Sequence, residues 1–131
     1  MTDPSHEGGC MCGAIRYQIS GKPLGVGLCH CLTCRRATGG PVVGFVDMPP
    51  GGFSWTSGEP AFFASSPGVR RGFCPVCGTS LTYEADDMPG EVHVLSATLD
   101  DPEPWVPTDA SFNSERISWV RIDLPDHKAY A

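Results

Sequence analysis

The stretch Cys29-His30-Cys31-Leu32-Thr33-Cys34 is the most informative part of the sequence, together with Cys74-Pro75-Val76-Cys77-Gly78 and Cys10-Met11-Cys12. All seven cysteines of the chain fall in these three clusters. An odd number of cysteines cannot form a complete set of disulfides, and the N-terminus carries no secretion signal. In the reducing compartment that this predicts, clustered cysteines are typical of metal sites. The alternative is a set of free or redox-active thiols.

The spacing predicts how the cysteines divide between two sites. Cys74 and Cys77 resemble a zinc knuckle, with Gly78 free to adopt a left-handed conformation. Such a knuckle supplies two of the four ligands that a structural zinc requires. Cys10 and Cys12 would supply the other two, because alternate side chains of an extended segment point to the same side. We therefore expect one structural zinc that joins the N-terminus to the middle of the chain.

The remaining cysteines, Cys29, Cys31 and Cys34, supply three ligands from one short stretch. Three protein ligands and one exchangeable position are the pattern of a catalytic zinc. The alternative is that a fourth protein group closes the site, with His30 the nearest candidate. In an extended Cys29-His30-Cys31 segment, however, His30 points away from the two sulfurs.

Composition indicates one soluble domain that spans residues 1–131. The chain contains 16 Gly and 13 Pro, which argues against long helices. Its net charge of −6 disfavours nucleic acid and anionic membranes as partners. No apolar run is long enough to cross a bilayer, so a cytoplasmic location is expected.

Apolar patterning predicts many short strands and one helix. The helix is expected at residues 32–38, ended by Gly39-Gly40. Turns rich in Pro and Gly separate the strands, so the predicted fold is mainly β. The expected strands are 13–19, 26–31, 42–46, 53–56, 60–64, 79–84, 92–98 and 117–124.

Few other residues stand out. The pairs Arg35-Arg36 and Arg70-Arg71 flank two of the cysteine clusters, where arginine would offset cysteinate charge. Trp105 lies in a proline-rich loop where an aromatic ring could cap a cleft. His6, His93 and His127 belong to no recognisable motif.

Four segments resemble the glutathione-dependent formaldehyde-activating enzyme family, which includes the centromere protein V-like domains. They are Gly9–Tyr17, Cys29–Gly40, Arg71–Leu81 and Leu95–Pro102. The resemblance implies a small, zinc-stapled, β-tent-like fold of packed antiparallel sheets with two zinc ions per chain. It assigns Cys10, Cys12, Cys74 and Cys77 to the structural zinc and Cys29, Cys31 and Cys34 to the catalytic zinc.

The same resemblance implies a carbon–sulfur lyase that adds a glutathione-like thiol to a small aldehyde, as in S-hydroxymethylglutathione synthase. Arg35, Arg36 and Arg71 would then bind the carboxylates of the thiol. The alternative is a non-catalytic zinc module that binds a protein, with both metals structural. One departure concerns the distal wall of the site: Ala110-Ser111 stands where family members often carry His-Ile. The sequence predicts no oligomeric state.

Overall fold

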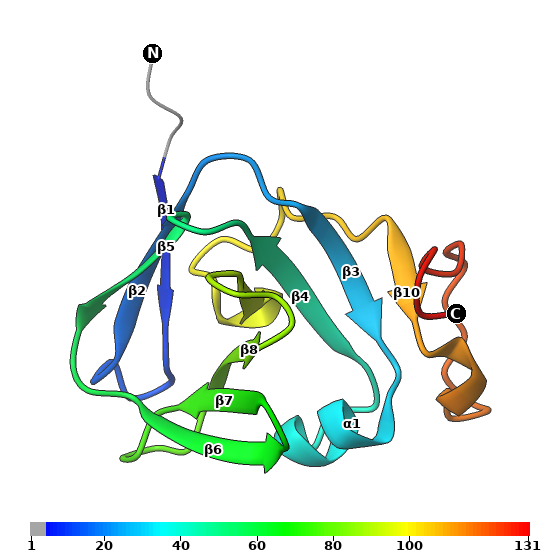
Figure 1. Ribbon diagram of the computed structural model, residues 1–131, viewed down its shortest axis with the longest axis horizontal. Coiled ribbons are helices and arrows are strands. Elements are labelled where there is room, and N and C mark those ends of the chain that lie inside the picture. The colour runs from blue at the N-terminus through cyan, green and yellow to red at the C-terminus, as the bar shows by residue number, and fades with distance from the viewer. Residues whose placement is uncertain (1–4) are drawn as a thin grey trace.

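A computed structural model describes residues 5–131 and shows two β-sheets and one short α-helix. The smaller sheet has the order β1-β2-β5, and the larger has the order β10-β3-β4-β9-β8-β7-β6 (Figure 1). The small sheet consists of β1 (Ser5–Gly9), β2 (Arg16–Ser20) and β5 (Phe53–Ser57). The large sheet consists of β3 (Gly25–Cys29), β4 (Val43–Met48), β6 (Ala61–Ser66), β7 (Val69–Phe73), β8 (Ser80–Ala85), β9 (Val92–Leu95) and β10 (Asp109–Ser111).

Side-chain alternation gives the large sheet two different faces. Val46 and Val94 lie on the face that packs against Tyr17 and its neighbours from the small sheet. Leu81 joins them from an irregularity in the pairing of β7 and β8, and all these residues are fully buried. This packed layer is the main hydrophobic core, which explains why the two sheets stay together. The opposite face carries the residues in between. Across the paired strands β7, β8, β9 and β4, these include Arg71, Tyr83, His93 and Asp47.

The helix α1 (Leu32–Thr38) has the bounds that the sequence predicts. Cys31 caps its start, because the Cys31 sulfur accepts a hydrogen bond from the Cys34 N–H at 3.3 Å. Gly39 ends it in the left-handed conformation, with φ of 75°. No helix among residues 5–131 is long and apolar enough to span a bilayer.

The mainly β prediction is confirmed, with one exception in its antiparallel pairing: β10 runs parallel to β3. The strand expected at 117–124 is wrong. There the backbone curls around a side chain, since Arg116 donates to the carbonyls of Ser118 and Val120 at 3.2 and 2.7 Å. The strand expected at 92–98 stops at Leu95, and Ser96–Thr98 forms a 3-10 turn.

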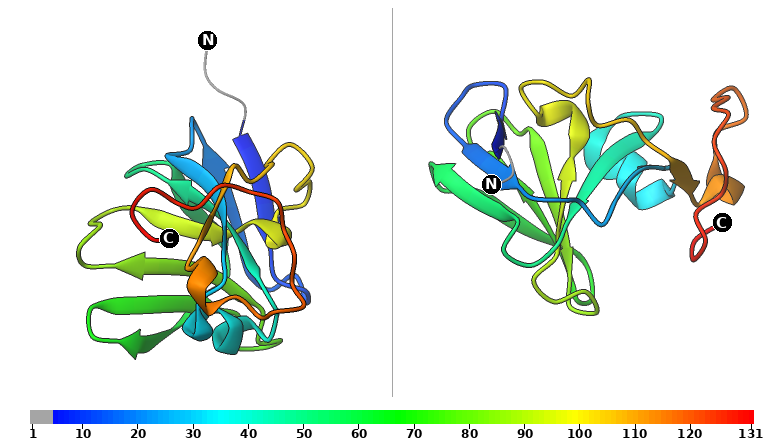
Figure 2. Two further views of the ribbon diagram at one scale, coloured as in Figure 1. Left: turned by 90° about the vertical axis from the view of Figure 1, so that its right-hand side faces the viewer. Right: turned by 90° about the horizontal axis from the view of Figure 1, so that it is seen from above.

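The C-terminal tail returns to the edge of the large sheet. Ala110 in β10 donates its N–H to Pro125 and accepts from His127, at 2.9 and 2.8 Å. Figure 2 shows this tail beside β10, on the side of the molecule away from the small sheet. The tail therefore lies next to β10 and close to the residues of the neighbouring strand β3.

Candidate metal centres and cleft

Cys10, Cys12, Cys74 and Cys77 come together as the spacing predicts, with all four sulfurs within 4.8 Å of one another. The Cys12 sulfur lies 3.6 Å from that of Cys10 and 3.8 Å from that of Cys74. A tetrahedral zinc with Zn–S bonds of about 2.3 Å spaces its sulfurs about 3.8 Å apart. This cluster could therefore hold one metal ion in a closed, four-thiolate site.

The backbone conformation around Cys10 and Cys12 differs from the extended segment that the sequence predicts. Cys10 and Cys12 lie in a turn, not in an extended segment, and the turn is closed by a hydrogen bond from Gly13 N–H to the Cys10 carbonyl at 3.2 Å. Cys74 and Cys77 also lie in a turn, which is closed by a hydrogen bond from Gly78 N–H to the Cys74 carbonyl at 2.8 Å. Gly13 and Gly78 both have φ of 82°, so each turn ends at a position with a left-handed backbone conformation, which glycine adopts more readily than other residues.

Backbone N–H groups point at the sulfurs of this cluster. The Cys10 sulfur accepts from Ile15 at 3.2 Å, and the Cys74 sulfur accepts from Val76 and Cys77 at 3.4 Å each. Hydrogen bonds from the Thr79 side chain and backbone lower the pKa of Cys77 to about 5. These donors stabilise thiolates, the form in which cysteine binds metal.

Cys29, Cys31 and Cys34 form the second cluster, again with sulfurs within 4.8 Å of one another. Cys29 ends β3 and Cys34 lies in the first turn of α1, so the strand-to-helix connection brings them together. Hydrogen bonds from Cys29 and Cys34 hold the pKa of Cys31 far below its ordinary value. Contacts of Cys29 with Cys31 and Cys34, together with burial, raise the pKa of Cys29. A thiolate is thus favoured at Cys31, and this cluster could also hold a metal ion.

Within residues 5–131, no fourth Cys, His, Asp or Glu joins this cluster. The neighbouring His30 is 1 % exposed and lies outside the cluster, as the alternation predicts. Its Nδ1 atom is buried without a hydrogen-bond partner, and burial lowers its pKa. The described part of the chain therefore offers three ligand atoms to a metal ion that this cluster could hold.

Arg71 connects the large sheet to the three-cysteine cluster. Both terminal nitrogens of its guanidinium lie 3.7 Å from the Cys34 sulfur, and its Nε donates to Ser65 at 3.1 Å. The guanidinium carbon lies 4.9 Å from the centre of the Tyr83 ring. Its positive charge therefore faces the thiols from a fixed position.

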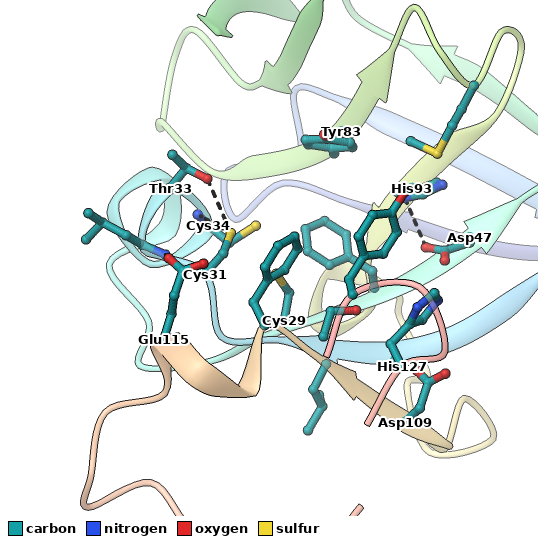
Figure 3. Close-up of a pocket in the computed structure, with 18 of the residues that line it drawn as sticks. Cys29, Cys31, Thr33, Cys34, Asp47, Tyr83, His93, Asp109, Glu115 and His127 are labelled. Atoms are coloured by element: carbon teal, nitrogen blue, oxygen red, sulfur yellow. Dashed lines mark hydrogen bonds and ion pairs between the residues drawn. The ribbon is translucent and has the colours of Figure 1, made fainter. Parts of the chain in front are cut away.

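The three cysteines line one end of a cleft of about 570 Å³. Its walls include the aromatic rings of Phe45, Tyr83, Phe112 and Tyr130 among polar and charged side chains. Figure 3 shows the cysteines at one end and Asp47, His93, Asp109 and His127 at the other. The cleft is thus long enough to offer a thiol-lined end and a distal end with acidic and imidazole groups.

The distal end is the part of the cleft that sequence reasoning missed. His93 lies between two carboxylates, with Nδ1 3.2 Å from Asp47 and Nε2 3.2 Å from Glu91. Burial raises the pKa of Asp47, and the nearby His93 opposes that shift. Asp47 and His93 are directly paired across β4 and β9, so a strand register would have revealed the contact.

Three residues that the sequence singled out, Arg35, Arg36 and Trp105, lie outside this cleft. Arg35 and Arg36 line a separate cavity of about 290 Å³ with Trp119, and not the cysteine-lined cleft. Their predicted role in binding substrate is therefore not supported by a shared cavity and stays a prediction. Trp105 packs against the core between the sheets and against the ring of His6, instead of capping the cleft. Ala110 is 3 % exposed, whereas Ser111 lines the cleft.

Comparisons with known proteins find similar sequences. The sequence pattern of the family described as "Glutathione-dependent formaldehyde-activating enzyme" matches residues 5–115. A Halomonas elongata protein named "Putative glutathione-dependent formaldehyde-activating enzyme" is 31 % identical over 127 residues, which cover 89 % of this chain and 80 % of that protein. A Schizosaccharomyces pombe protein named as an uncharacterized lyase is 33 % identical over 82 residues, which cover 61 % of this chain and 58 % of that one.

The fold also has a counterpart among solved structures. A crystal structure of a Rhodobacter sphaeroides protein superimposes with a TM-score of 0.61 at 21 % sequence identity. The match covers 75 % of this chain and 93 % of that one. At this level of identity the likeness concerns the fold alone.

Proposed function

Because this chain belongs to the glutathione-dependent formaldehyde-activating enzyme family, we propose that it is a zinc-dependent carbon–sulfur lyase. Its reaction joins a glutathione-like thiol to a small aldehyde and also runs in reverse. The observation that carries the proposal is the set of three cysteines at the end of a cleft, which no fourth Cys, His, Asp or Glu from residues 5–131 joins. A closed four-ligand site would instead favour a structural zinc module.

We assign one zinc to each cysteine cluster. Sulfur-rich sites suit zinc among the common divalent metals, and the sulfur spacing in the first cluster fits a tetrahedron. Cys10, Cys12, Cys74 and Cys77 would hold a structural ion, whereas Cys29, Cys31 and Cys34 would hold the ion of the active site. When bound there, zinc supplies a Lewis-acidic position that favours the thiolate form of an incoming thiol.

The chain's own residues position the reactants. Arg71 faces the Cys34 sulfur, where it offsets thiolate charge and is available to a carboxylate of the thiol. Aromatic side chains of the cleft, Phe45 and Phe112 among them, offer apolar surface beside the thiol-lined end. In the reaction a sulfur–carbon bond forms, the carbonyl π bond breaks, and the thiol proton ends on the former carbonyl oxygen. Holding both reactants together supplies the rate gain.

Exchange NMR between free formaldehyde and its glutathione adduct tests the proposal. The exchange rate should rise in proportion to the concentration of added protein. Cys31→Ser should abolish that rise, because it removes one of three ligands. An unchanged exchange rate at high protein concentration, with no binding of glutathione by calorimetry, would overturn the proposed activity.

A further inference from the structure

The C-terminal segment Pro125–Tyr130 supplies one wall of the cysteine-lined cleft. Backbone hydrogen bonds hold it against Ala110 of β10 and against Phe112, which follows that strand and donates its N–H to the Tyr130 carbonyl at 2.7 Å. The segment's His127 and Tyr130 line the cleft, whereas Lys128 between them is exposed and does not. This segment lies beyond residues 5–115, the range that matches the family pattern. It is therefore a part of the site that the family assignment does not describe.

Two ring stacks fix the position of Tyr130. Its ring lies 5.5 Å from that of Phe112 at an interplanar angle of 19°, and 5.2 Å from that of His127 at 27°. Phe112 in turn packs against the buried cluster that contains Cys29 and Cys34. The thiol-lined end and the tail are thus separated by one aromatic ring.

Phe112 also has an unfavourable backbone conformation. Its φ and ψ of 56° and 43° lie in the left-handed region, and it is the one non-glycine residue with positive φ in the described chain. This conformation is costly for a residue with a Cβ atom, so contacts nearby must compensate for it. The backbone hydrogen bond from Phe112 N–H to the Tyr130 carbonyl is a contact of this kind, and it does not depend on the Tyr130 ring. The tail and Phe112 therefore hold each other in place at the cleft.

We propose that Tyr130 selects among thiols by contacting the body of the substrate beyond its sulfur. The proposal rests on the proposed function, because it takes the three-cysteine end as the place where the thiol group binds. A thiol with a long body, such as a tripeptide, extends past Phe112 and reaches the Tyr130 ring. A thiol with only two carbon atoms ends before it.

Calorimetry on the zinc-loaded protein of residues 1–131, with glutathione and with 2-mercaptoethanol, tests this proposal. Tyr130→Ala should weaken binding of glutathione by about tenfold, the size expected for loss of an aromatic contact. Binding of 2-mercaptoethanol should change less than about twofold, since that thiol does not reach the ring. Tyr130→Phe keeps the ring and should bind both thiols as the wild type does. Lys128→Ala, on the same segment but outside the cleft, is the matched control.

The outcomes separate the two proposals. Equal losses for both thiols would mean that Tyr130 only maintains the site, and no loss for either would mean that the ring is not contacted. Each of these results would overturn the selection by Tyr130. A wild-type protein that binds neither thiol, with both zinc ions present, would overturn the proposed function and the selection with it.

Discussion

Arg71 and Arg70 are neighbours in sequence, yet the alternation of β7 gives them different surroundings. Arg71 faces the Cys34 sulfur, whereas Arg70 forms an exposed ion pair with Asp86 at 2.8 Å. We expect Arg71→Met to lower the metal affinity of the three-cysteine site by roughly tenfold, because a charge-assisted hydrogen bond is lost. Competition with a chromophoric chelator measures the metal affinity of the three-cysteine site.

Arg70→Met is the matched control for this prediction. It removes the same charge from the next residue, and exposed ion pairs contribute little, so affinity should stay within about twofold. Equal losses in the two variants would indicate a general effect of protein charge and would contradict a specific role for Arg71.

The two cysteine clusters should respond differently to single substitutions. Cys77→Ser removes a ligand from the cluster that joins the two halves of the chain, so the protein should be unfolded or insoluble. Cys34→Ser should leave the protein folded with one metal ion fewer. Circular dichroism and metal analysis by mass spectrometry check both variants. Identical behaviour of the two would show that the clusters do not divide into structural and active-site roles.

At this scale the sequence predicts the cysteine grouping better than the rest of the cleft. Short spacings restrict which sulfurs can meet, so both clusters form as expected. Asp47 and His93 meet only because β4 and β9 pair in one register, although 46 residues separate them in the chain. That register depends on packing of the whole sheet, which no local pattern reveals.

Among the elements, α1 depends on its glycine end. Gly39 has φ of 75°, and a Cβ atom there would meet no neighbour within 4 Å. Gly39→Ala should therefore lower the free energy of unfolding by about 1 kcal/mol through backbone strain alone. Denaturation in urea measures the change.

Gly25 in β3 provides the comparison for Gly39. Its φ lies outside the left-handed region, and an added Cβ would meet only Asp47 Oδ2, at 3.9 Å. Gly25→Ala should change the free energy of unfolding by less than about 0.5 kcal/mol. A loss as large as that of Gly39→Ala would mean that strain at Gly39 is not the cause.

Elements were predictable where local signals were strong. Cys31 and Gly39 cap α1 at both ends, which explains why its bounds match the prediction. The segment 117–124 has strand-like composition, but Arg116 donates to the carbonyls of Ser118 and Val120. These carbonyls are then turned toward one side chain and not toward a neighbouring strand, as hydrogen bonding in a β-sheet requires. The strand β10 was not predicted, because Asp109–Ser111 is too short to carry a pattern.

For the whole molecule, stability depends on the layer between the sheets, where Tyr17 is fully buried. Its hydroxyl lies 2.6 Å from Thr98 Oγ1, and burial raises its pKa from 10.0 to about 12. The unfolded chain therefore loses this proton at lower pH than the folded protein does. The contribution of Tyr17 to the free energy of unfolding should be constant below pH 10. It should fall as the pH rises toward 12, by roughly 2–3 kcal/mol in total.

Urea denaturation across this pH range tests the contribution of Tyr17. In Tyr17→Phe the fall above pH 10 should be smaller by that amount, although the variant loses the hydrogen bond to Thr98 at every pH. An identical pH dependence in the two proteins would show that Tyr17 ionises as readily when folded as when unfolded.

The central claim is that the three-cysteine site holds a metal with one position open to a thiol, whereas the four-cysteine site is closed. Cadmium NMR of the cadmium-substituted protein tests it most directly, because the chemical shift reports the number of sulfur ligands. We predict two resonances, of which only the one lost in Cys34→Ser moves toward the four-sulfur position when glutathione is added. Two resonances that both remain unchanged at saturating glutathione would contradict the account.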